Sequence, residues 1–140
     1  MLMNDDGNMI RVLMIEPGKP PEMREISDTL KSMQEVVGGW IEEYMPFDDD
    51  VALVVNEEGK INGLPLNRAI RSEDGSLQDI IAGPFFICSA PVESESYQSL
   101  TPEMEKKYRE KFRNPERFYM TDKGIHVVQE GSPREKEAER

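Results

Sequence analysis

The most constraining feature of the sequence is the apolar run DIIAGPFFICSA, residues 79–90. A run that is apolar at nearly every position is typical of a strand buried on both faces, so it predicts a central strand of a sheet. Gly83 and Pro84 interrupt the run, and proline lacks the amide donor that a central strand needs. We therefore expect the strand to bend here or to begin again at Phe85.

The patterns before this run predict strands, one helix and a hairpin. The segment at residues 9–17 is rich in residues that favour strands and predicts a strand, and a second extended segment is expected around residues 24–26. The segment SDTLKSMQEVVGG predicts a helix, with Ser27 or Asp28 as its cap and Gly38 at its end. The segments WIEEYMPF and VALVVNEE predict a hairpin around the acidic turn at residues 48–50.

The patterns after the run predict a second helix and a closing hairpin. The segment TPEMEKKYREKFRNPERF offers Thr101 as a cap and Pro102 at the first helical position. Its apolar residues Met104, Tyr108 and Phe112 recur at i, i+4 and i+8, which is typical of an amphipathic helix. The segment FYMTDKGIHVVQ predicts a hairpin with its turn at Asp-Lys-Gly.

Together these elements predict the α+β class: a small, mostly antiparallel sheet of five to six strands, one helix packed on it and a second, C-terminal helix. The length of 140 residues and a hydrophobic fraction of 37% allow one modest core. We expect a single domain over residues 1–130. Residues 131–140 are too polar to fold alone and predict a flexible tail.

The charge distribution limits the classes of partner. The net charge is −11, and residues 1–100 hold 19 acids against 7 bases. Such a field repels phosphate backbones, so we expect no direct nucleic-acid binding, while a basic protein partner remains possible. The N-terminus is acidic where a signal peptide is basic, and no apolar run approaches 18 residues. We therefore expect a cytoplasmic protein without a membrane segment.

The sequence predicts no catalytic residue, metal site or cofactor. One His and one Cys cannot supply a standard zinc site, and the aspartates at residues 48–50 lack the spacing of a calcium loop. His126 alternates with apolar residues as in a strand, and Cys88 lies in the apolar run, which indicates a buried thiol. We expect the protein not to be an enzyme.

The best candidate for a binding site is the polar stretch NGLPLNR. Asn62 and Gly63 can form a tight turn, and Pro65 stiffens the next bend. Asn67 offers an amide group and Arg68 a planar fork of donors, which suit a phosphate, a base edge or a carboxylate. The alternative is structural: Arg68 pairs with a local acid and Asn67 bonds its own backbone.

Two further features could complete such a pocket. Trp40 is either a core aromatic or a platform on which a ring stacks. The bend from Gly83 to Phe85 can expose backbone amides beside the NGLPLNR stretch. The predicted ligand-binding set is therefore Asn62, Gly63, Pro65, Asn67, Arg68, Trp40, Gly83 and Phe85.

Three segments in order, MQEVVGGWIE, VALVVNEEGKINGLPLNRAI and DIIAGPFFI, resemble the domain of unknown function 3846 family, which is found in bacteriophages, plasmids and their bacterial hosts. The resemblance covers about residues 10–90, so residues 91–130 form a C-terminal extension. It implies a small accessory protein of a mobile element, located in the cytoplasm of the bacterial host. It supplies no catalytic residues.

Two functions follow as hypotheses. The first is a non-enzymatic accessory protein that sequesters a small nucleotide-type ligand and so counters host immune signalling, with a site that a homo-oligomer would duplicate at its interface. The alternative is an acidic inhibitor of the anti-CRISPR or anti-restriction type. Its surface between Glu42 and Glu58 would occlude a basic host nuclease by imitating the charge of DNA.

Overall fold

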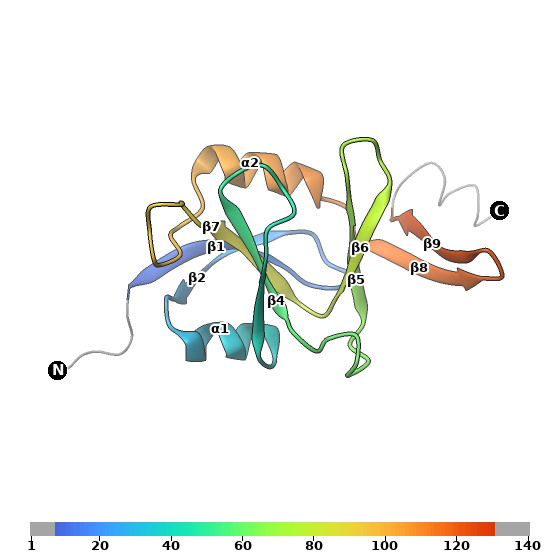
Figure 1. Cartoon of the computed structure of the whole chain (residues 1–140), viewed down its shortest axis with the longest axis horizontal. Coiled ribbons are helices and arrows are strands. Elements are labelled where there is room, and N and C mark those ends of the chain that lie inside the picture. The colour runs from blue at the N-terminus through green and yellow to red at the C-terminus, as the bar shows by residue number, and fades with distance from the viewer. Residues whose placement is uncertain (1–7, 131–140) are drawn as a thin grey trace.

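The computed structural model describes residues 8–130, and its centre is a five-stranded antiparallel sheet in the order β2-β1-β7-β4-β3 (Figure 1). The strands are β1 (Met9–Ile15), β2 (Glu22–Ser27), β3 (Ile41–Tyr44), β4 (Val51–Asn56) and β7 (Phe85–Ser89). β7 is the central strand, and Phe86 lies opposite Met14 of β1 and Val54 of β4. The apolar run thus forms a central strand that begins again at Phe85.

Helices cover both faces of this sheet (Figure 1). The helix α1 (Leu30–Val37) buries Met33 and Val37 against one face. Its N-cap is Thr29, whose hydroxyl accepts a hydrogen bond from the Ser32 amide at 3.2 Å. The predicted cap at Ser27 or Asp28 is therefore wrong, because Ser27 still belongs to β2 and the helix begins later. Its predicted end at Gly38 is confirmed.

The helix α2 (Pro102–Lys111) packs on the other face and confirms the predicted amphipathic helix. Thr101 is its cap and accepts a hydrogen bond from the Met104 amide at 3.2 Å. Tyr108 and Phe112 are buried in the core, and the Phe112 ring meets Phe85 edge-on at a centroid distance of 5.9 Å. Two distinct cores therefore lie on the two faces of one sheet.

Two smaller hairpins complete the described fold. β5 (Leu66–Arg71) and β6 (Leu77–Ala82) pair on the α2 side of the main sheet, and β8 (Glu116–Thr121) pairs with β9 (Gly124–Gln129) beyond them (Figure 1). The predicted closing hairpin is confirmed. Residues 8–130 hold nine strands rather than five or six, in three sheets. The α+β class with a mostly antiparallel sheet is confirmed.

Neither helix within residues 8–130 has the length and apolar character needed to cross a membrane. The predicted tail at residues 131–140 lies outside the described residues.

Candidate functional site

Arg68 does not face a ligand, because it is completely buried. Its Nε and Nη2 atoms donate to the carbonyl oxygen of Phe112 at 3.2 and 3.1 Å, and Nη2 also donates to the carbonyl oxygen of Lys19 at 2.6 Å. Its Nη1 atom donates to Oδ1 of Asn67 at 2.9 Å. Burial lowers the pKa of the guanidinium, and the charge of Glu116 opposes this shift. Arg68 therefore fastens the end of α2 and the β1–β2 loop to β5.

Asn67 is also completely buried, and its side chain stabilises the fold through hydrogen bonds to the backbone. Its side-chain amide donates to the carbonyl oxygens of Ile15 at 3.0 Å and Gly83 at 2.8 Å. The expectation of a polar loop here is wrong, because Asn67 and Arg68 belong to β5. The structural alternative is also wrong in its details. The Arg68 side chain donates hydrogen bonds to carbonyl and amide oxygens rather than to an acid, and the Asn67 side chain donates to backbone far along the chain rather than to its own backbone.

The other predicted site residues do not gather around a pocket. Asn62, Gly63 and Pro65 are exposed on the turn before β5. Trp40 is 65% exposed, so it is not a core aromatic, whereas Phe85 is completely buried in the core. These positions therefore form no common site.

Gly83 is buried and bonded into the fold. It has a φ of 84°, and its amide donates to the carbonyl oxygen of Pro65 at 2.7 Å. The side chain of Leu64 lies where a Cβ atom at Gly83 would be. None of the eight predicted residues lines the cavity described next.

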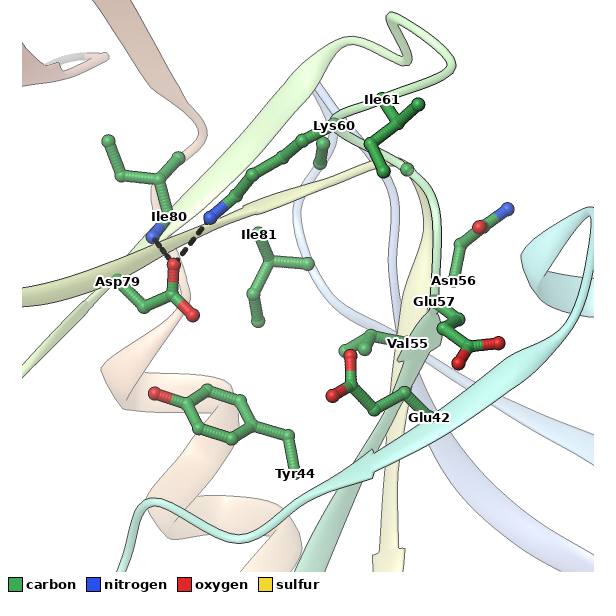
Figure 2. Close-up of a pocket in the computed structure, with 12 residues that line it drawn as sticks. Glu42, Tyr44, Val55, Asn56, Glu57, Lys60, Ile61, Asp79, Ile80 and Ile81 are labelled. Carbon is green, nitrogen blue, oxygen red and sulfur yellow. Dashed lines mark hydrogen bonds and ion pairs between the residues drawn. The ribbon is translucent and has the colours of Figure 1, made fainter.

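A cavity of about 360 Å³ lies between the edge of the main sheet and the β5–β6 hairpin (Figure 2). Its walls come from β3, the end of β4, the following turn and β6. Its lining combines an apolar floor with charged residues at the rim. The lining residues are Glu42, Tyr44, Val55, Asn56, Glu57, Gly59, Lys60, Ile61, Asp79, Ile80, Ile81 and Ala82.

The register of the β3–β4 pair places two carboxylates at this cavity. Glu42 lies opposite Val55, so both side chains project from the same face of the sheet. Glu57 follows β4, and its amide donates to the carbonyl oxygen of Trp40 at 2.9 Å. Buried Asn56 fixes the turn, because its side chain donates to the carbonyl oxygen of Val37 at 3.0 Å and accepts from the Glu58 amide at 2.8 Å.

A close backbone contact closes one end of the cavity. A Cβ atom at Gly59 would lie 2.6 Å from the carbonyl oxygen of Ala82, which real side chains do not tolerate. Only glycine lets the turn after β4 approach the end of β6 this closely. The turn that carries Glu57 and Lys60 is thereby held against the hairpin that carries Asp79.

The cavity carries unbalanced negative charge. Lys60 is neutralised, because its Nζ atom lies 2.6 Å from Oδ1 of Asp79, which also accepts from the Ile80 amide at 2.7 Å. Glu42 and Glu57 lie on the opposite side of the cavity from this pair (Figure 2), and their carboxylates have no hydrogen-bond or ion-pair partner among residues 8–130. The site is therefore suited to a cation.

The side chain of Tyr44 also lines this cavity and is exposed to its negative charge. Burial raises the pKa of Tyr44, and the negative charge of Asp79 raises it further. The ring of Tyr44 and the side chains of Val55 and Ile81 give the cavity apolar surface beside its carboxylates (Figure 2). Such a lining fits a ligand with an aliphatic stem and a positive head group.

A second cavity, of about 490 Å³, lies between residues 46–49, the β5–β6 turn and α2. Its lining includes Phe47, Arg71, Lys107 and Lys111. The Nζ atom of Lys111 lies 4.9 Å from the centre of the Phe47 ring, and Lys107 forms an ion pair of 2.6 Å with Asp49. The lining of this cavity holds three cations and three acids, whereas the acids outnumber the cations in the first cavity.

The single cysteine and the single histidine of the chain lie on strands of different sheets. Cys88 is completely buried, and burial raises the pKa of its thiol, which confirms the predicted buried thiol. His126 lies on β9 opposite Tyr119. Within residues 8–130 no three His, Cys, Asp or Glu side chains are arranged to hold a metal ion.

The fold and cavity define a small α+β sheet protein with an acidic pocket at the sheet edge. The chain belongs to the family described as Domain of unknown function (DUF3846), whose model matches residues 10–113. The match extends beyond residue 90, where the sequence resemblance was expected to end, and includes α2. No curated protein and no solved structure matches the chain.

The sequence contained a partial signal for this cavity. The acidic surface between Glu42 and Glu58 was part of the inhibitor hypothesis, but Tyr44, Lys60 and Asp79 were not predicted to belong to any site. Alternation along the predicted β3–β4 hairpin places Glu42 and Tyr44 on one face. No local pattern predicts that β6 packs beside that face.

Proposed function

We propose that the protein is a non-enzymatic binding protein whose acidic cavity receives a lysine or arginine side chain of a protein partner. One observation carries the proposal: Glu42 and Glu57 line the cavity, and neither carboxylate has an ion-pair partner among residues 8–130. Unpaired carboxylates that line one cavity attract a cation and repel a phosphate. The proposal therefore favours the inhibitor hypothesis over nucleotide capture at this site.

The apolar part of the cavity supports a basic side chain rather than a free metal ion. Lysine and arginine carry aliphatic stems that cover apolar surface while the charged head stays near water or an acid. Val55 and Ile81 supply that surface, and Glu42 and Glu57 supply the acids. Because both carboxylates are exposed to solvent, an ion pair with each of them contributes about 1 kcal/mol or less.

The surrounding charge supports a basic protein as the partner. The acidic residues at positions 48–50 and the net charge of −11 extend the negative field beyond the cavity, which accelerates encounter with a positive surface. The family resemblance implies a mobile-element accessory protein, for which a basic host nuclease is a natural target. Inhibition of such a nuclease in the bacterial cytoplasm is the function that we propose.

A labelled peptide of six arginines tests the cavity, with a hexaglutamate peptide as the negative probe and binding followed by fluorescence anisotropy at low and high salt. We expect Glu42→Gln combined with Glu57→Gln to weaken binding about tenfold. The matched control is Glu25→Gln with Glu35→Gln, because both residues are exposed on β2 and α1, away from the cavity. An equal loss in both double variants would contradict the proposal, since only net charge would then matter.

Nucleotide-type capture is the second candidate, and the second cavity favours it. Arg71 and Lys111 offer cations near the Phe47 ring, on which a base could stack. The test is native mass spectrometry of the protein from a nucleotide-rich lysate, compared with Arg71→Ala combined with Lys111→Ala. A small molecule that is released from the native protein and missing from the variant supports this candidate, and an empty native protein contradicts it.

A further inference from the structure

β9 differs from every other edge strand of the described fold. The edge strands β2, β3, β5, β6 and β8 all contain acidic or basic residues, whereas β9, GIHVVQ, contains no Asp, Glu, Lys or Arg. Natural proteins place charges on edge strands because these prevent pairing with another chain. β9 lacks that protection and is rich in β-branched residues, which favour strand pairing.

The outer edge of β9 offers a regular set of free backbone groups. The Glu130 amide donates to the carbonyl oxygen of Pro115 at 2.7 Å, so these two residues form a bonded pair of the β8–β9 ladder. Bonded and non-bonded pairs alternate in an antiparallel ladder. The backbone groups of Ile125, Val127 and Gln129 therefore point away from β8. Within residues 8–130, β9 pairs with β8 alone.

The same hairpin carries an apolar face that its own chain covers only in part. The register places Phe118 opposite Val127 and Met120 opposite Ile125, so these four side chains share one face. None of them is buried, and Met120 is 79% exposed. An isolated two-stranded hairpin is marginal in water, whereas a wider sheet with an apolar face is stable.

Charge favours a second copy of this chain as the partner of this edge. The protein as a whole carries a net charge of −11, which opposes self-association over most of its surface. Residues 114–130 carry three acids and two bases, so the hairpin is nearly neutral. The hairpin also lies at one end of the molecule, beyond β5 and β6 (Figure 1), so two copies can meet there while their acidic bodies stay apart.

We propose that the protein forms a two-fold dimer by antiparallel pairing of β9 with β9 of a second copy. In the register centred on Val127, each Val127 lies opposite its counterpart, and Ile125 lies opposite Gln129 of the other copy. Every outward N–H and C=O group of these residues then gains a partner. Four strands join into one sheet, and its apolar faces lie on the same side. β8 and β9 follow the residues that the family model matches, so the dimer belongs to this chain's extension.

The first test is the molar mass of the full chain by light scattering after size exclusion, over about 5–200 µM. We expect the native mass to rise from 16.0 kDa toward twice that value. Val127→Lys should stay monomeric, because like charges directly opposite one another destabilise a strand pair. The control is Tyr119→Lys, which adds the same charge to β8, away from the pairing edge of β9, and should still dimerise. A native mass that stays at 16.0 kDa, or dimerisation of Val127→Lys, overturns the proposal.

A second test holds even if Val127→Lys fails to fold. In the proposed register the two Cα atoms at position 127 lie about 5.5 Å apart, within the range that a disulfide spans. Val127→Cys should therefore form a covalent dimer under mild oxidation, while Lys123→Cys in the hairpin turn should not. Cys88 does not interfere, because it is completely buried. Equal cross-linking of the two variants, or none in Val127→Cys, contradicts the register.

Discussion

Removal of Arg68 is the sharpest test of whether this residue serves folding or binding. Arg68→Ala leaves the carbonyl oxygens of Phe112 and Lys19 without their donor, and each buried orphan group costs about 1–3 kcal/mol. The lost volume of a fully buried side chain adds a cavity cost of about 2 kcal/mol or more. Release of a buried cation from its desolvation penalty offsets part of this sum. We expect a net loss of about 4 kcal/mol in the free energy of unfolding.

The assay is equilibrium unfolding in urea followed by far-ultraviolet circular dichroism. Arg71→Ala is the matched control, because Arg71 is exposed on the same strand and its Nη1 atom donates to the carbonyl oxygen of Gly75. We expect the control to lose less than about 1 kcal/mol. Arg68→Met restores most of the volume without the hydrogen bonds and should lie between the two.

A small loss in Arg68→Ala, equal to that of Arg71→Ala, would refute the structural role of Arg68. It would mean that the carbonyl oxygens of Phe112 and Lys19 find water instead, so that the side chain is free to leave its buried position. Such a result would support the hypothesis from the sequence that Arg68 binds a ligand.

Three further predictions concern single residues. Cys88 should react with a thiol reagent only as fast as the protein unfolds, since its thiol is buried and its pKa is raised; rapid labelling of the native protein would contradict this. Hydrogen bonds, led by the one from the Ser72 hydroxyl, lower the pKa of Asp74 to about 2. The stability that Asp74 contributes is therefore fully present above the pKa of about 3.9 that an Asp has in the unfolded chain, and it is lost as the pH falls toward 2. Titration of the Asp74 carboxyl group by NMR should give a higher midpoint in Ser72→Ala. Gly59→Ala should cost about 1–3 kcal/mol in urea unfolding, because its Cβ meets the carbonyl oxygen of Ala82; an unchanged midpoint would show that the turn moves freely.

Local patterns predicted the elements whose signals lie within one short segment. The cap at Thr101 and the spacing of Tyr108 and Phe112 predicted the start and the buried face of α2, because a helix repeats its own geometry. The break at Gly83 and Pro84 likewise predicted where β7 begins. These features depend on the conformational preferences and hydrogen bonds of residues that are close together in the sequence.

The candidate site was less predictable because it depends on contacts across the fold. Arg68 and Asn67 are polar, and polarity indicated a loop, yet carbonyl oxygens from β1, the β1–β2 loop and the end of α2 satisfy them in a buried strand. The acidic cavity arises where Asp79 of one sheet faces Glu42 of another. No sequence pattern shows which distant segment will supply such partners.

The placement of β7 has a consequence for the order in which the sheet can assemble. β1 and β4 are both synthesised before β7, yet each lies beside β7 and not beside the other. As the chain leaves the ribosome, the β1–β2 and β3–β4 hairpins can form early from local contacts. The sheet closes only when residues 85–89 arrive between them. Until that moment the apolar edges of β1 and β4 stay open, so a nascent chain stalled before residue 85 exposes the surfaces that chaperones bind.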